Sequence, residues 1–210
     1  QLMLVSLVVI LIGGMIEMIP TFLVKSNVPT IASVKPYTPL ELQGRDIYIR
    51  EGCNTCHSQM IRPFRSETAR YGEYSKAGEF VYDHPFQWGS KRTGPDLHRI
   101  GGKYPDSWHF NHMFDPTTMS PGSIMPSYPW LLENDLDTSN TAAKIQVMIA
   151  LGVPYPKGFD KIANKKLSEQ SDSIASSLKK DGIETLSSKE IISIIAYLQR
   201  LGTDIKAEKK

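Results

Sequence analysis

Two cysteines separated by two residues and followed directly by a histidine lie at positions 53–57, Cys53-Asn54-Thr55-Cys56-His57. This is the spacing of a covalent c-type haem attachment, in which both thiols bond to the porphyrin and the histidine ligates the iron. One turn of backbone sets the two sulfurs along one edge of the porphyrin and carries the adjacent imidazole over the metal. The segment therefore predicts one covalently attached haem c, tethered by Cys53 and Cys56, with His57 as the proximal ligand.

Two other uses of a Cys-x-x-Cys pair are disfavoured. Tetrahedral zinc needs four ligands, and the chain has only these two cysteines. A thioredoxin-like redox pair would lie between a strand and a helix in an alternating βα pattern, and no such pattern surrounds Gly52. Haem attachment is therefore the preferred interpretation.

Residues 1–24 are almost entirely apolar (QLMLVSLVVILIGGMIEMIPTFLV). As an α-helix this stretch is long enough to cross a hydrocarbon core of about 30 Å, so we expect a transmembrane anchor. A cleaved signal peptide is the alternative, but its apolar part would be shorter and no small-residue cleavage site comes before Pro20. Glu17 must face protein or lie near an interface, because a carboxylate facing lipid is costly. Gly13 and Gly14 would let a neighbouring helix approach closely.

The remainder is expected to form an extended linker over 25–37 and a folded domain over 38–210. A first helix should run from Thr38 to about Glu51. The sequence Thr-Pro-Leu-Glu at its start combines a capping residue, a proline at the first helical position and a glutamate placed for a capping box.

A matching helix is expected near the C-terminus. The sequence Ser187-Ser188-Lys189-Glu190 again predicts a capping box, and Gly202 predicts the end of the helix. Between them lies an apolar stripe of Ile191, Ile194, Ile195, Leu198 and Leu201. We expect Tyr197 and Leu201 to pack against the face of the first helix that carries Gly44, which closes a mainly α domain.

The charge balance does not indicate a strongly charged partner. With 24 Lys and Arg against 22 Asp and Glu, the formal net charge is +2. No nucleic acid or other strongly charged partner is indicated.

Residues 93–103 (TGPDLHRIGGK) form a second motif. They resemble the loop after the proximal histidine in class I cytochromes c, in which the proline packs against the haem and its carbonyl accepts the histidine Nδ1 proton. The resemblance implies this role for Pro95, and it implies a class I cytochrome c-like haem domain, with insertions, behind one N-terminal transmembrane helix. An ordinary Gly-Pro turn is the alternative.

Eight side chains are candidates for the sixth iron ligand: His84, His98, His109, His112, Met60, Met113, Met119 and Met125. Residues 120–130 (SPGSIMPSYPW) lack helical periodicity, and Met125 precedes a proline there, as in the distal loop of class I cytochromes c. Met125 is our predicted distal ligand and Met119 the second choice, although a methionine more often serves in packing. A His/Met pair leaves no open iron position, so the haem should transfer electrons and not bind oxygen.

The anchor, the 53–57 motif, the runs at 69–75 (ARYGEYS) and 82–97 (YDHPFQWGSKRTGPDL) and the 125–130 loop (MPSYPW) are together similar to the mono-haem cytochrome c subunit of cbb(3)-type cytochrome c oxidase. The resemblance implies electron transfer to a haem-copper catalytic subunit, which reduces oxygen to water and pumps protons. It also implies a multi-haem cytochrome c subunit as donor, a single pass through the bacterial inner (cytoplasmic) membrane, and a periplasmic haem domain.

Insertions at about 62–92 and 136–185 distinguish the chain from a minimal cytochrome c. The resemblance assigns the first to docking on the catalytic subunit; a loop that packs on its own domain is the alternative. The second should contain a helix over about 142–151, a break at 152–156 and an amphipathic helix with Ile162, Leu167, Ile174 and Leu178, and no function is assigned to it.

A calcium contact is implied at Ser90, where the family has a calcium ion between the chains near the haem propionates. One serine cannot form a calcium site, which needs several oxygen ligands. Most of the ligands would therefore have to come from elsewhere.

Three other functions compete with the oxidase subunit. The cytochrome c subunit of a nitric oxide reductase also has one anchor and one haem domain, but the first insertion and the 82–97 run disfavour it. A free membrane-tethered electron carrier would purify alone. A haem enzyme that acts by itself, such as a peroxidase, would need an open iron position.

Overall fold

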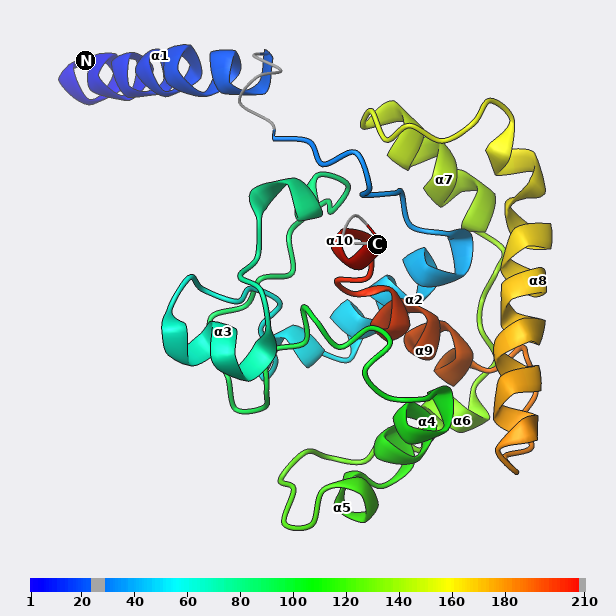
Figure 1. The fold of residues 1–210 in the computed structure, drawn as a ribbon. Helices are drawn as coiled ribbons and strands as arrows, with labels where there is room; N and C mark the ends of the chain where they lie inside the picture. Colours follow the sequence, from blue (N-terminus) through cyan, green and yellow to red (C-terminus); the bar gives the residue numbers. More distant parts are fainter. Residues whose placement is uncertain (24–28, 208–210) are drawn as a thin grey trace.

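The computed structural model describes residues 1–23 and 29–207. In this part of the chain the secondary structure is helical, and the only β pairing is an isolated bridge between Asp135 and Lys189. The mainly α fold class is confirmed (Figure 1). In chain order the elements are α1 (Leu2–Leu23), α2 (Pro39–Arg50), η2 (Cys53–Thr55), α3 (Arg65–Tyr71), η3 (Ala77–Phe80), α4 (Asp106–Phe114), α5 (Pro116–Met119), α6 (Trp130–Glu133), α7 (Thr141–Ala150), α8 (Phe159–Lys180), α9 (Glu190–Arg200) and α10 (Asp204–Ala207).

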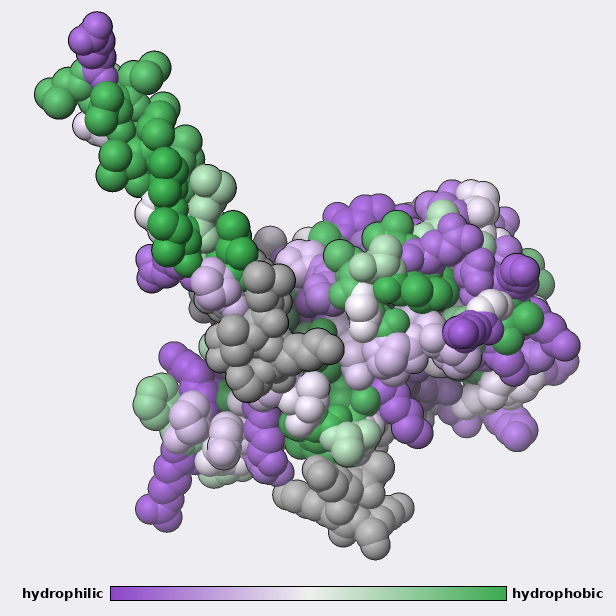
Figure 2. Space-filling model, turned by 90° about the horizontal axis from the view of Figure 1, so that it is seen from above, coloured by the Kyte–Doolittle hydropathy of each residue, from purple (hydrophilic) through white to green (hydrophobic). Residues whose placement is uncertain are grey.

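The predicted anchor is a single helix, α1, of 22 residues. Its segment Leu2–Pro20 is long and apolar enough to cross a membrane, and none of that segment is buried against the rest of the protein. Figure 2 shows hydrophobic residues along most of its length. Val24 and the linker residues 25–28 lie outside the described residues, whereas 29–37 contain no helix.

The start of α2 has the predicted capping box. The Glu41 N–H donates to Thr38 Oγ1 (3.2 Å), and the Thr38 N–H donates to Glu41 Oε2 (2.8 Å). Pro39 occupies the first helical position, where the absence of an N–H leaves no intrahelical bond unmade. Backbone donors at the start of α2 are therefore satisfied. The other end of the helix leads directly to Cys53.

The centre of the domain is the crossing of α2 and α9 (Figure 1). A Cβ added at Gly44 would lie 1.9 Å from the Ser193 carbonyl oxygen and 2.9 Å from Tyr197 Cβ. The rings of Tyr48 and Tyr197 lie 5.3 Å apart. The predicted packing of Tyr197 on the Gly44 face is confirmed, and the apolar stripe of α9 is buried in the same core.

The predicted capping box at the start of α9 is wrong. The N-cap residue is Lys189, which makes no side-chain capping bond. A turn at 187–188 precedes it, and this part of the chain pairs with an earlier segment: the Leu136 N–H donates to the Ser188 carbonyl (2.7 Å) and the Glu190 N–H to the Asn134 carbonyl (3.1 Å). Because this pairing holds 188–190 beside 134–136, the helix begins only at Glu190, and Ser188 Oγ donates to Asp135 instead.

The 136–185 insertion folds as predicted, as α7, a break and α8. A small second core lies between α2, α7 and α8, formed by Leu42, Ile145, Met148, Val153 and Ala163. Leu167 and Leu178 are buried and Ile174 is partly buried, but Ile162 is 45% exposed. Ala163 takes the inward position at that turn, so the buried stripe of α8 differs from the predicted one in its first residue.

Candidate haem-binding site

The 53–57 segment is a tight turn that begins where α2 ends. Gly52 has a left-handed backbone (φ 70°), and the turn η2 follows it. The Cys56 and His57 N–H groups both donate to the Cys53 carbonyl, at 3.2 and 2.9 Å. Cys53 is half-buried and Cys56 exposed, and both are free thiols. One turn of backbone thus presents two thiols and an imidazole, as thioether attachment requires.

The His57 side chain is oriented by a backbone carbonyl. His57 Nδ1 lies 2.8 Å from the Pro95 carbonyl oxygen. A carbonyl can only accept, so Nδ1 carries the proton and Nε2 keeps its lone pair. That is the form of imidazole that ligates a metal, with its other nitrogen held by an acceptor. The residues present therefore fit a haem iron at Nε2.

Gly94 lies against the same imidazole, a role that the sequence alone does not predict. A Cβ at this position would come within 2.2 Å of His57 Cε1 and 2.7 Å of Nδ1. The Gly94 N–H also donates to the Cys56 carbonyl at 3.0 Å. The signal was present in the Gly-Pro pair of the 93–103 motif, but only the folded chain shows that the glycine leaves room for the ring.

Partly buried apolar side chains from three segments pack against the same main core as Cys53. They are Leu97, Ile100, Phe110, Met125 and Tyr128. Apolar side chains suit a porphyrin, because little of its surface is polar. The loop that carries Met125 is fixed to α4 by the Tyr128 N–H, which donates to the Met113 carbonyl at 2.8 Å.

The other methionines lie in different surroundings. Met113 is buried in the main core, and Met119 ends the short helix α5. Met125 lies in a segment without helix and, like Cys53, packs against the main core. Ligation by Met125 stays a prediction.

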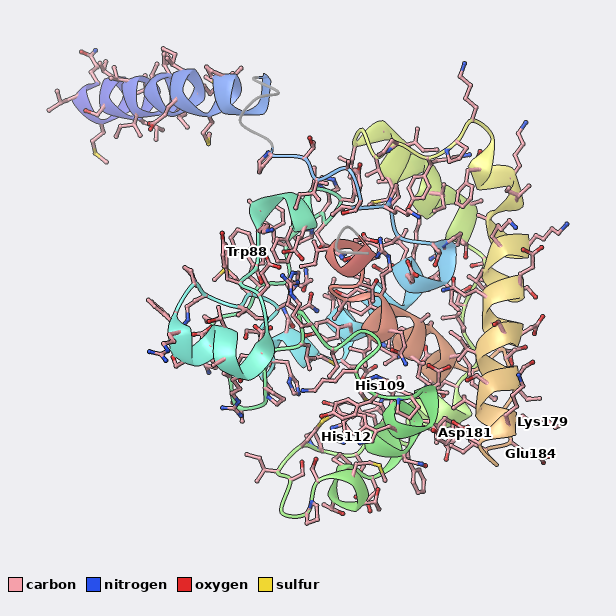
Figure 3. The ribbon with its side chains drawn as sticks, viewed as in Figure 1. Trp88, His109, His112, Lys179, Asp181 and Glu184 are labelled. Atoms are coloured by element: carbon pink, nitrogen blue, oxygen red, sulfur yellow. The ribbon has the colours of Figure 1, made fainter. Side chains whose placement is uncertain are left out.

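Three of the four candidate histidines are at least partly buried. His98 is hydrogen-bonded through Nε2 to Glu79 (2.9 Å) and stacked on Phe80. His109 and His112 both come from α4 (Figure 3). Burial lowers the pKa of His109 to about 4 and also lowers the pKa of His112. Both imidazoles on α4 are thus favoured in the neutral form.

Among the described residues, no cluster of metal-ligating acidic, histidine or cysteine side chains accompanies the implied calcium contact. Ser90 is exposed. Over the described ranges, no group of three or more His, Cys, Asp or Glu side chains could hold a metal ion. Calcium ligation at Ser90 stays a prediction.

Comparison with known proteins agrees with this geometry. No curated protein matches the sequence. A family model described as "Cytochrome C oxidase, mono-heme subunit/FixO" matches residues 1–205, from the anchor to α10, and so spans the attachment turn, the Pro95 loop and both insertions. The chain therefore belongs to the FixO family, the mono-haem subunits of cytochrome c oxidase.

Proposed function

We propose that this chain relays single electrons, through one haem c, to the haem-copper catalytic subunit of a cbb(3)-type cytochrome c oxidase, which reduces oxygen to water with proton pumping. The observation that carries the proposal is the 2.8 Å contact between His57 Nδ1 and the Pro95 carbonyl. It leaves Nε2 as a ligand nitrogen, directly after two free thiols at thioether spacing.

Each residue has a separate task in the proposal. Cys53 and Cys56 tether the cofactor, His57 ligates from the proximal side, and Pro95 fixes the His57 tautomer and ring orientation. Met125 closes the distal side. The bound haem supplies a one-electron couple, and the His/Met pair raises its potential relative to two nitrogen ligands.

The partners follow from the family and from the exposed surface. Membership in an oxidase subunit family implies a catalytic subunit as partner. In the first insertion, Phe86 is 52% exposed and stacks on Trp88 with ring centroids 4.7 Å apart. Exposed aromatic pairs are favoured at protein interfaces, so we assign this surface to contact with the catalytic subunit. A multi-haem cytochrome c subunit is the proposed donor.

The proposed location is the bacterial inner membrane, with α1 as a single pass and the haem domain in the periplasm. A calcium ion at Ser90, shared with the catalytic subunit, belongs to the same proposal. Haem attachment to a Cys-x-x-Cys-His segment takes place outside the cytoplasm, and this supports the orientation.

The test is mass and optical analysis of the complex purified from its native host. We expect the chain to carry the mass of one haem, a c-type pyridine haemochrome spectrum, and co-purification with a large haem-copper subunit. A Cys56→Ala variant with unchanged spectrum and mass would contradict thioether attachment. Purification of the haem-loaded chain alone would favour a free tethered carrier, and co-purification with a nitric oxide reductase would favour that alternative.

A further inference from the structure

The hydrogen bond from His57 to Pro95 belongs to a series of hydrogen bonds that joins residues 56–58 to residues 94–96. The Gly94 N–H donates to the Cys56 carbonyl (3.0 Å), one residue before His57 and Pro95 on each segment. One residue after them, Ser58 Oγ donates to Asp96 Oδ2 at 2.6 Å. The position of the Pro95 carbonyl thus depends on the bonds on either side of it.

The Asp96 carboxylate accepts more hydrogen bonds than any other group of this series. Its side chain is 0% exposed. Oδ2 accepts from Ser58 Oγ and from the Met60 N–H (2.8 Å), and Oδ1 accepts from the His98 N–H (2.9 Å). Three donors from both segments therefore converge on one carboxylate, as buried charges require.

Arg92 supplies a compensating positive charge. Its guanidinium lies 3.6 Å from Asp96 Oδ2, and its Nε donates to Ser58 Oγ at 2.8 Å. The same guanidinium donates to the Met60 carbonyl and to Glu67, both at 2.7 Å. Ser58 is thus held on both sides, as a donor to Asp96 and as an acceptor from Arg92, which fixes the residue next to the proximal ligand.

We infer that Asp96 is a positioning residue for the proximal ligand: with Ser58, it holds the Pro95 carbonyl on His57 Nδ1 and lowers the reduction potential of the haem. The inference rests on the proposed haem function. An acceptor held firmly on Nδ1 raises the basicity of the ligating imidazole, and a more basic ligand stabilises the ferric iron. Loss of the Asp96 charge would also leave the positive charge of Arg92 less compensated, which favours ferrous iron, because ferric iron carries one more positive charge than ferrous iron.

The variant Asp96→Asn tests both contributions. An asparagine side chain keeps the shape but has a single acceptor oxygen for three donors, and it carries no charge. We expect a tenfold fall in the ratio of oxidised to reduced haem at a fixed ambient potential, which is a rise in midpoint of about 59 mV for one electron. Ser58→Ala retains the carboxylate but loses one bond, so its midpoint should rise by less.

The measurement is a potentiometric titration of the haem c absorbance in the purified oxidase complex. Ser188→Ala is the matched control, because its hydroxyl also donates to an aspartate (2.8 Å) but beside the start of α9. Haem content is measured first in the unmodified complex. A chain without covalent haem there would overturn the proposed function itself.

With haem in place, the midpoints decide the inference. Unchanged midpoints in both Asp96→Asn and Ser58→Ala would overturn the positioning role, and so would a fall in either. If the oxidase complex with Asp96→Asn does not assemble, the midpoint of the Ser58→Ala complex alone tests the inference. A lower unfolding temperature with an unmoved midpoint would mark a purely structural network and would also overturn the inference.

Discussion

Gly94 lies so close to the imidazole of His57 that a methyl group at that position would come within 2.2 Å of Cε1. Gly94 is not among the glycines with positive φ. Its backbone could therefore be adopted by any residue, and the requirement for glycine comes from the ring alone. The predicted proximal ligand, His57, thus has a carbonyl at the edge of its ring and only a glycine against its face.

Gly94→Ala should displace the His57 ring and weaken its bond to Pro95. We expect a lower yield of covalent haem, and in the loaded fraction a rise in the reduction potential, because the histidine loses its firm acceptor. Haem content per chain and potentiometry measure both effects. Thr93→Ala, at the exposed neighbouring position, is the control. Equal haem content and equal potential in the two variants would contradict the steric role.

Met125→His should lower the reduction potential substantially, because a second nitrogen ligand stabilises ferric iron relative to a thioether. The red-region sulfur-to-iron charge-transfer band of the oxidised protein should disappear. Met119→His is the paired variant, and it should keep the band. A band that survives Met125→His and is lost in Met119→His would move the distal ligand to Met119.

Gly44→Ala should destabilise the crossing of α2 and α9. The new methyl group would lie 1.9 Å from the backbone carbonyl oxygen of Ser193, which can move only if a helix moves. Overpacking of this kind costs about 1–3 kcal/mol of unfolding free energy. Denaturant unfolding of the detergent-solubilised chain measures the loss. Ser173→Ala, exposed on α8, should leave the midpoint in place; a similar midpoint for both variants would refute the close crossing.

Acid should destabilise the domain through Glu79. Burial by itself would raise the pKa of this carboxyl, but hydrogen bonds from His98 and Arg99 lower it from the ordinary 4.5 to about 2. Because the folded-state pKa lies below the unfolded value, this stabilisation is present above pH 4.5 and is lost as the pH falls toward 2, with a full value of about 3 kcal/mol.

The pH dependence of denaturant unfolding measures this contribution. Glu79→Gln should flatten the dependence between pH 4.5 and 2. Glu184→Gln, at an exposed position, should not. An unaltered acid dependence in Glu79→Gln would show that other groups cause it.

Alkaline phosphatase fused after Lys210 should be active, because the haem domain is expected on the periplasmic side and this enzyme folds only there. The same fusion to a chain without residues 1–23 should give no activity, since α1 would no longer direct export. An inactive fusion to the full chain would reverse the proposed topology.

The sequence by itself determined the local features. The apolar run specified α1, and Thr38 with Glu41 specified the start of α2, because each depends on residues close together in the chain. The c-type attachment predicted from the 53–57 spacing is local in the same sense. The helices of the second insertion followed from their periodicity for the same reason.

The tertiary structure decided what depends on distant segments. The start of α9 differs from the predicted capping box because 188–190 pair with 134–136, fifty residues earlier in the chain. Gly94 and Asp96 acquired their places beside His57 and Ser58 only when the two segments came together. Capping and helical periodicity act over a few residues and can be inferred from order alone, whereas the orientation of a ligand is set by contacts between segments, which exist only in the folded chain.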